Sequence, residues 1–211
     1  MGSARVVTTL AVGLLLAAAV LAGGPARAEE KARYEPIVTG DGMLAQPWFL
    51  QSFLDLQEDL AAATAEGKRF AIFWEQRGCP YCKEMHEVNL AIPAIQEYVR
   101  EHFEVLQLNL WGAREVTDFD GEVLEERKLA RKYGIAYTPT IQFFPAEVEA
   151  VAGQPGKEAE VQRMPGYFKP FHYLAMFQYV EERAYEDTPF QAYLAEARVD
   201  MKARGLDIEA W

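Results

Sequence analysis

The order of apolar and polar residues along this chain predicts three buried strands. Residues 69–74 contain the uninterrupted run Phe-Ala-Ile-Phe-Trp, the pattern of a short strand that is buried on both faces, as in a parallel sheet. Residues 103–110 alternate well enough between apolar and polar residues to predict a second central strand. Residues 140–144 form a third short apolar run. These three segments are therefore expected to form the centre of the fold.

Helical spacing of apolar residues predicts that helices separate and follow these strands. Pro47 and Gly67 are typical of the start and the end of a helix, and Gly134 is placed to end a later one. Pro93 lacks the amide hydrogen that a helix interior needs, so a kink or break is expected there. The predicted helices cover residues 47–67, 83–89, 94–102, 122–133, 171–185 and 189–204.

The remaining segments complete an α/β arrangement. Residues 148–152 and 160–164 are expected to be two short strands that form a hairpin around a Gly-Gln-Pro-Gly turn. The alternation of strands and helices predicts a central mixed sheet flanked by helices, with the first strands parallel and the last pair antiparallel. Residues 29–46 are polar without a clear period and are expected to lie on the surface, and residues 111–121 are expected to be a loop.

The first residues have the features of a secretory signal peptide. A basic residue precedes an apolar stretch over residues 10–21, which is followed by an Ala-Arg-Ala triplet. The alternative is an uncleaved anchor helix, but the apolar stretch is short for a membrane span, which needs ~20 residues. We expect residues 1–28 to be removed on export to the periplasm. Residues 29–211 are then expected to form a single domain with its core in residues 69–185 and with N-terminal and C-terminal helical extensions.

Charge and cysteine content narrow the possible functions. The formal net charge is −11 for 211 residues, and an acidic surface argues against a nucleic-acid partner. The only two cysteines, Cys79 and Cys82, stand three positions apart, so a disulfide between them closes no long loop and adds little stability. Because exported proteins usually use cysteines as structural crosslinks, this isolated pair is expected to have a chemical role.

The cysteine pair follows the first predicted strand and begins a helix, at the edge where α/β sheets place active groups. Unpaired amides and the helix dipole favour a thiolate at Cys79, and Arg77 and Lys83 either add to this effect or are solvated. Cys79 is expected to be exposed and to attack a partner disulfide, and Cys82, shielded within the first turn, is expected to resolve the mixed disulfide.

Zinc is the alternative ligand chemistry for a Cys-x-x-Cys pair. His86 follows Cys82 by four positions and is the candidate third ligand, but His102 and His172 lie in segments without ligand-like spacing. Structural zinc needs four ligands, so we expect no metal and place His86 on the helix surface. Beyond the cysteine pair no cofactor is expected.

At these residues the chain resembles thioredoxin-like proteins. The matching segments are Phe73-Trp74, Cys79-Pro80-Tyr81-Cys82-Lys83 and Thr138-Pro139-Thr140. The resemblance implies a thioredoxin fold over residues 69–185, thiol–disulfide oxidoreductase activity and a cis peptide bond before Pro139. It also implies that Thr138 offers backbone hydrogen bonds to a substrate peptide, and that Pro80, Tyr81, Thr138 and Pro139 form the substrate-binding site.

A narrower resemblance is to the periplasmic thioredoxins associated with bacterial sulfur oxidation, the SoxW and SoxS type. It rests on the segments 78–86, 115–121 and 137–140. It implies reduction of disulfides or sulfur adducts on a partner protein, such as a sulfur-carrier protein, and a membrane thiol transporter as electron donor.

The chain also departs from ordinary thioredoxin. Ile72 stands where thioredoxin has a buried acid, so Glu75 is the candidate proton acceptor for Cys82. The Pro-Tyr dipeptide between the cysteines is the one that glutaredoxins use, so glutathione remains open as a substrate, although no basic cluster for its carboxylates is evident.

Two questions remain open in the sequence. The loop over residues 111–121 follows a central strand, so we interpret it as a loop that reads the partner; the alternative is a solvated connection with Trp111 packed in the core. The alternative function is a non-catalytic binding module or metal carrier on the same scaffold, because a fold alone does not imply a function.

Overall fold

The computed structural model describes residues 35–209 and residue 211. The expected signal peptide, residues 1–28, lies outside the described residues. Within the described part of the chain, no helix is both long enough and apolar enough to cross a membrane.

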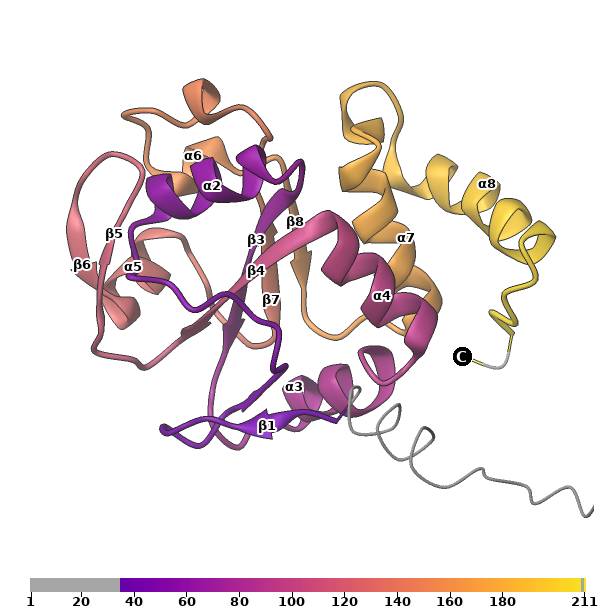
Figure 1. Ribbon diagram of the computed structural model, residues 1–211, viewed down its shortest axis with the longest axis horizontal. Helices are drawn as coiled ribbons and strands as arrows, with labels where there is room; N and C mark the ends of the chain where they lie inside the picture. The colour runs from indigo at the N-terminus through magenta and orange to yellow at the C-terminus, as the bar shows by residue number, and fades with distance from the viewer. Residues whose placement is uncertain (1–34, 210) are drawn as a thin grey trace, which may run out of the picture. The chain divides into compact units, whose positions relative to one another are not determined.

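A four-stranded mixed sheet forms the centre of this unit (Figure 1). Its strand order is β4-β3-β7-β8, with β3 at Arg69–Glu75, β4 at Phe103–Asn109, β7 at Thr140–Phe143 and β8 at Gln162–Pro165. β3 pairs with β4 in parallel, whereas β7 runs antiparallel to both β3 and β8. The three predicted central strands and the mixed thioredoxin-type sheet are confirmed.

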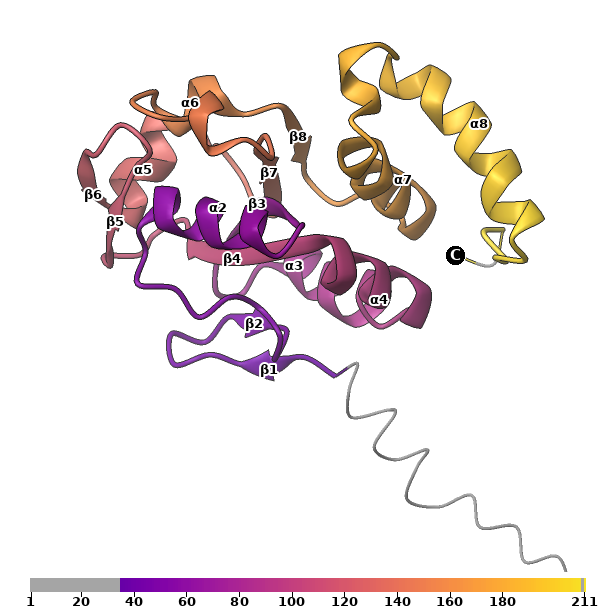
Figure 2. The same cartoon turned by 45° about the horizontal axis from the view of Figure 1, so that its top comes forward.

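Alternate residues of β3 divide the core into two layers, because successive side chains of a strand point to opposite faces. Ala71 and Phe73 belong to the layer that α4 and α7 cover, and Phe70, Ile72 and Trp74 belong to the layer beneath α2 and α5. Figures 1 and 2 show α4 and α7 side by side at one end of the sheet. The helices of these layers are α2 at Leu56–Ala65, α4 at Pro93–His102, α5 at Glu126–Lys132 and α7 at Pro170–Glu181.

The N-terminal segment differs from the predictions. A small hairpin, β1 (Ile37–Val38) with β2 (Leu44–Ala45), precedes the first helix. Residues 35–42 lie near the surface, as expected, but Met43, Ala45 and Gln46 are buried. The helix predicted from Pro47 starts only at Leu56. The cause is Asp55, whose carboxylate accepts the amides of the second and third helical residues at 3.1 and 3.0 Å and so fixes the N-terminus there.

The predicted loop and helix of residues 111–133 are also rearranged. β5 (Glu115–Thr117) pairs antiparallel with β6 (Val123–Glu125), so the first residues of the predicted helix are extended. The helix α5 begins at Glu126, whose buried carboxylate accepts the Asn109 amide at 2.9 Å and forms an ion pair of 2.5 Å with Arg114. These contacts hold the start of α5 against the end of β4.

The hairpin predicted over residues 148–164 is wrong. Residues Val148–Ala150 form a short 3-10 helix and Gly156–Ala159 form helix α6, while β8 pairs with β7 instead. At Gly156 the backbone packs so closely against Tyr133 that a side chain there would overlap the Tyr133 hydroxyl. The backbone of this segment therefore packs against the core as a helical turn rather than as a strand.

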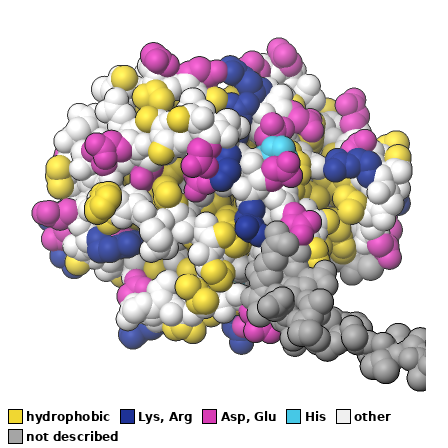
Figure 3. Space-filling view, in the orientation of Figure 1, with side chains coloured by type: hydrophobic (Ala, Val, Ile, Leu, Met, Phe, Trp, Pro, Cys, Tyr) yellow, Lys and Arg dark blue, Asp and Glu magenta, His cyan; other side chains and the backbone are white. Residues whose placement is uncertain are grey.

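Two C-terminal elements complete the unit. Helix α7 ends at Glu181, four residues earlier than predicted, and Arg183 then adopts a left-handed conformation with φ of 59°. Helix α8 (Phe190–Ala203) buries Ala197 and Met201 in the layer that contains α7. On the face drawn in Figure 3, acidic and basic side chains are interspersed.

Candidate active site

The cysteine pair lies at the carboxyl end of β3, as predicted. Residues 76–78 form a short turn in which Gly78 has a φ of +75°, a conformation that glycine adopts without strain. Cys79 is the N-cap residue of α3 (Pro80–Glu84), and Pro80 occupies its first turn. The missing amide of Pro80 is harmless there, because the first amides of a helix have no partner within it.

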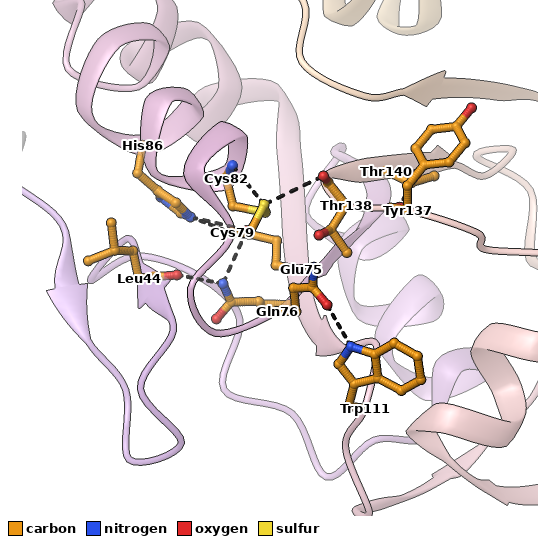
Figure 4. Close-up of a disulfide and its surroundings, with 11 residues drawn as sticks. Leu44, Glu75, Gln76, Cys79, Cys82, His86, Trp111, Tyr137, Thr138 and Thr140 are labelled. Carbon is orange, nitrogen blue, oxygen red and sulfur yellow. Dashed lines mark hydrogen bonds and ion pairs between the residues drawn. A yellow bond between two sulfur atoms is a disulfide. The ribbon is translucent and has the colours of Figure 1, made fainter.

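The two cysteines form a disulfide in this structure. The Cys82 amide donates a hydrogen bond to Cys79 Sγ at 3.0 Å, so the helix start already places a donor at the sulfur expected to carry negative charge after reduction. Cys79 Sγ also lies 3.5 Å from the carbonyl oxygen of Thr138 (Figure 4). The predicted pair and the predicted Thr138 loop are thus brought together.

The exposure of the sulfur side chains is lower than expected. Cys79 is 6% exposed and Cys82 is 3% exposed, so the expectation that Cys79 is an exposed residue is wrong for this disulfide form. Cys79 Sγ is enclosed between the Thr138 carbonyl at 3.5 Å and the Cys82 amide at 3.0 Å. Both cysteines nevertheless line an open cavity of ≈ 500 Å³, through which a partner sulfur can approach.

The N-terminal hairpin forms one wall of this cavity. Gly42, Met43 and Leu44 line it together with the cysteine loop and Lys83. Gly42 has a φ of +82°, and a side chain at this position would overlap the stem of Arg77. Residues before the first helix therefore help to shape the site, a contribution that their polar, aperiodic sequence did not signal.

The loop opposite the disulfide has the expected geometry. The Thr138–Pro139 peptide bond is cis, as the resemblance implied. Thr138 is buried and its hydroxyl has no hydrogen-bond partner, whereas Tyr137 beside it is exposed. The roles of Thr138, Pro139, Pro80 and Tyr81 in substrate binding stay predictions.

Exposed aromatic residues surround the disulfide. Tyr81 is exposed and stacks with Tyr167 at a centroid distance of 6.3 Å. Trp111 is 69% exposed, and its indole donates a hydrogen bond of 2.5 Å to Gln76, in the turn before Cys79. Figure 4 shows Trp111 beside this turn. The alternative in which Trp111 packs in the core is therefore wrong.

The second half of the loop over residues 111–121 contains buried side chains, whereas Trp111 is exposed. Val116, Asp118 and Phe119 are buried in the layer beneath α2 and α5 or at its border. Asp118 accepts hydrogen bonds from the Tyr133 hydroxyl and from the Gly156 amide. Trp111 and residues 113–115 are exposed, whereas the part around Asp118 anchors the loop to the core.

A buried polar cluster beneath the disulfide was missed by sequence reasoning. His86 was expected on the helix surface, but it is fully buried and lies 3.0 Å from the Glu75 carboxylate. The cause is a π-helical segment, Met85–Asn89, in which the Leu90 amide bonds to the carbonyl of Met85 at 3.0 Å. Such a widened turn changes which side chains face inward, and no pattern in the sequence indicated it.

His86 is also unavailable to the cysteines as a metal ligand. Its Nε2 faces Glu75 and its Nδ1 faces the side-chain amide of Gln46 at 3.2 Å. Among residues 35–209 and 211, no group of three or more His, Cys, Asp or Glu side chains is arranged to hold a metal ion. The site offers the chemistry of a cysteine pair beside a buried carboxylate.

Comparisons with known proteins agree with this geometry. Residues 56–181 match the family model of the thioredoxin-like domain. A thioredoxin-fold protein from Helicobacter pylori is similar with 19% identity and a TM-score of 0.50, covering 67% of this chain and 94% of that one.

Two further solved structures are similar to this chain, with lower TM-scores. A thioredoxin from Thermus thermophilus has 26% identity and a TM-score of 0.45 over 58% of this chain and 81% of that one. The oxidised C-terminal domain of DsbD from Neisseria meningitidis has 16% identity and a TM-score of 0.41 over 57% and 86%. No curated protein matches the sequence. Because the family model matches more than half of this chain, the chain belongs to the thioredoxin-like domain family.

Proposed function

We propose that this protein is an exported thiol–disulfide oxidoreductase that reduces disulfides or sulfur adducts on a partner protein in the periplasm. The observation that carries the proposal is the place of Cys79 Sγ, between the Cys82 amide at 3.0 Å and the Thr138 carbonyl at 3.5 Å. A sulfur in this position has a donor to stabilise its thiolate and lines an open cavity. These are the requirements for nucleophilic attack on another sulfur.

The reaction runs through a mixed disulfide. The Cys79 thiolate attacks one sulfur of the partner disulfide, and the other partner sulfur leaves as a thiolate. Cys82, as thiolate, then attacks Cys79 Sγ, which forms the Cys79–Cys82 disulfide and releases the second partner thiolate. Two electrons pass from the cysteine pair to the partner, and the Cα atoms, 5.2 Å apart, need no large movement to close the ring.

Partner recognition is assigned to the residues around the sulfur. The Thr138 carbonyl oxygen lies beside Cys79 Sγ, and Pro80 lines the cavity together with both cysteines. We assign the exposed Tyr81 and the cis Pro139 to the same surface. The exposed Trp111 adds an apolar surface on the side of Gln76. A large aromatic side chain that is mostly exposed near a reactive group is a typical feature of a protein-binding surface.

The narrower part of the proposal names the partner protein and the source of the electrons that reduce the cysteine pair. The resemblance to thioredoxins of sulfur oxidation supports a sulfur-carrier protein, with a modified cysteine, as the substrate. It also supports a membrane thiol transporter as the donor that reduces the Cys79–Cys82 disulfide again.

An insulin-type reduction assay beside metal analysis tests the proposal. Metal-free protein is expected to catalyse insulin reduction by a small dithiol, and Cys79→Ser is expected to lose this activity. Stoichiometric bound metal without turnover would instead support a metal carrier. Absence of both turnover and metal would support a non-catalytic binding module.

A further inference from the structure

The N-terminal hairpin is an addition to the thioredoxin-like domain that reaches the active site. Its strands, β1 and β2, precede the domain of residues 56–181. Three hairpin residues, Gly42, Met43 and Leu44, line the cavity that contains both cysteines. Because this wall is not part of the common domain, it is a place where this chain can differ from other members in the partners that it accepts.

The hairpin is held both by its own turn and by the sheet. The Thr39 amide donates to the Met43 carbonyl at 2.9 Å, and the Gly42 amide donates to the Thr39 carbonyl at 3.0 Å. The Asn109 side-chain amide, at the end of β4, donates to Asp41 Oδ2 at 2.8 Å. The wall beside the cysteines is therefore held in place from two sides, as a surface that selects between partners requires.

The outer edge of β2 carries an unpaired backbone amide. The Thr39 amide bonds to the Met43 carbonyl, which makes these residues a hydrogen-bonded pair of the antiparallel ladder. The next pair, Val38 with Leu44, then has backbone groups that point away from the partner strand. The Leu44 carbonyl agrees with this direction, because it accepts from the Gln107 side chain at 2.6 Å. The Leu44 amide points the same way and has no hydrogen-bond partner within the described part of the chain.

This unpaired amide lies on the side of the hairpin that borders the cysteine cavity. Gln107, the partner of the Leu44 carbonyl, also donates to Glu75 at 3.1 Å, and Glu75 lines the cavity together with Leu44. The Thr138 carbonyl lies 3.5 Å from Cys79 Sγ. Figure 4 shows Leu44 on one side of the cysteine pair and Thr138 on the other. An unpaired strand edge in such a place is suited to bind an extended peptide.

The size and charge of the cavity limit what can enter between these two sides. Its volume of ≈ 500 Å³ lies in the range of small-ligand pockets, about 300–1,000 Å³, so a segment of a partner chain fits and a folded domain does not. Lys83 and Glu87, the charged residues exposed at the cavity, lie 3.7 Å apart and compensate each other. The segment that fits best is therefore extended and without net charge.

We propose that the outer edge of β2 binds an extended, uncharged segment of the partner protein that carries the reacting cysteine. The Leu44 amide donates to a backbone carbonyl on one side of that cysteine, and the Thr138 loop contacts the segment on its other side. The proposal rests on the proposed oxidoreductase function and adds the class of substrate, a cysteine in a flexible segment that is recognised through its backbone.

Two probes with the same leaving group test this recognition on the full chain. One is an unstructured, uncharged peptide whose single cysteine is joined by a disulfide to a chromogenic aromatic thiol. The other joins the same thiol to 2-mercaptoethanol, which has no peptide backbone. The Cys79 thiolate attacks the sulfur of the peptide or of mercaptoethanol, and the chromogenic thiolate leaves with the electron pair. Its release gives a second-order rate constant for each probe.

The variants change single amides of the hairpin. Leu44→Pro removes the proposed donor, and proline is tolerated on an edge strand where the amide points outward. Val38→Pro is the matched control, because it removes the outward amide of the opposite strand, where Val38 is 71% exposed and away from the residues that line the cavity. Leu44→Ala keeps the amide and shortens the side chain.

The expected effect is that of one lost hydrogen bond. Leu44→Pro is expected to react about 3- to 10-fold more slowly than wild type with the peptide probe, and within about 2-fold of wild type with the mercaptoethanol probe. Val38→Pro is expected to stay within about 2-fold with both probes, and Leu44→Ala is expected to be at least about 2-fold faster than Leu44→Pro with the peptide. An equal loss with both probes would indicate damage to the cysteine site and would contradict the proposal.

Asp41→Ala tests the proposal without a proline in the hairpin. This variant removes the acceptor of the Asn109 side chain and so loosens the hairpin from β4. It is expected to slow the reaction with the peptide probe about 2- to 5-fold and to leave the mercaptoethanol probe unaffected. Circular dichroism and urea unfolding of each variant show whether the domain stays folded.

The results distinguish failure of this proposal from failure of the proposed function. Unchanged rates with the peptide probe in Leu44→Pro and Asp41→Ala would overturn recognition by the hairpin and leave the oxidoreductase function standing. An equal loss in Leu44→Ala and Leu44→Pro would also overturn it, because the side chain and not the backbone would then be responsible. If wild type released neither probe faster than Cys79→Ser, the proposed function itself would be wrong.

Discussion

Asp118 provides the sharpest stability prediction because its carboxylate joins three separate elements. It is 1% exposed, and its Oδ1 accepts from the Tyr133 hydroxyl, the Gly156 amide at 3.1 Å and the Phe119 amide at 2.8 Å. The ammonium group of Lys132 lies 2.7 Å from Oδ2. Asp118→Ala leaves the Tyr133 hydroxyl and the Gly156 and Phe119 amides without this acceptor, whereas Lys132 keeps its ion pairs with Asp120 and Glu122.

The expected cost follows from this burial. Each buried donor that loses its acceptor costs about 1–3 kcal/mol, so Asp118→Ala is expected to cost about 3–5 kcal/mol in total, which for a domain of this size lowers the Tm by roughly 6–20 °C. Asp118→Asn keeps one acceptor oxygen but loses the charge, and is expected to cost about 1.5–3 kcal/mol. Asp120 shares Lys132 at the same 2.7 Å but is 22% exposed, so Asp120→Asn is the matched control with an expected cost below about 1 kcal/mol.

Urea unfolding followed by circular dichroism, with a thermal scan for each variant, measures these costs. The order wild type, Asp120→Asn, Asp118→Asn, Asp118→Ala is expected, with reduction of small disulfides retained in every variant below its Tm. If Asp118→Ala cost no more than Asp120→Asn, the loop would not be anchored through Asp118, and the division of this loop into an anchoring part and a free part would be wrong.

Three further predictions concern the surface and the packing. Burial raises the pKa of Asp59 from 3.8 to about 6, so the contribution of Asp59 to the free energy of unfolding is present below about pH 4 and is lost as the pH rises through 6. Asp59→Asn is expected to flatten this part of the pH profile of urea unfolding. An unchanged profile would show that Asp59 does not have this raised pKa. Gly112→Ala is expected to cost about 1–3 kcal/mol because the new side chain would overlap the Glu126 carboxylate, whereas Gly40→Ala, in open space, should cost little in the same unfolding assay. Trp111→Ala should lower the rate of reduction of a protein disulfide several-fold and spare small disulfides, and equal rates on both would remove the role of Trp111 in recognition.

The central sheet and the position of the cysteines were predictable because they depend on local signals. The uninterrupted apolar run of β3 has no other stable place than between two layers, and the Cys79-Pro80 start of a helix follows from the fixed φ of proline. The break before α4 followed in the same way from Pro93. Each of these features is decided by residues close together in sequence.

Other features depend on contacts between residues that are distant in sequence, so the local pattern either predicted the wrong structure or gave no prediction. The apolar spacing of residues 47–60 resembles a helix, yet the Leu50 amide bonds to the Val105 carbonyl at 2.9 Å and covers the edge of β4 instead. His86 faces the interior because it lies in the π-helical turn, and there its ring nitrogen finds a hydrogen-bond partner in the distant Gln46. A capping signal was present in Asp55 with Glu58 three residues later, and it would have placed the helix start correctly.

Trapping with a defined peptide disulfide distinguishes the proposed roles of Cys79 as the attacking sulfur and Cys82 as the resolving one. Reduced Cys82→Ser and Cys79→Ser proteins are each mixed with the peptide, and adducts are located by mass spectrometry. We expect a stable peptide adduct on Cys79 in the Cys82→Ser protein and little adduct in the Cys79→Ser protein. An adduct that forms only in the Cys79→Ser protein would reverse the two roles and contradict the account.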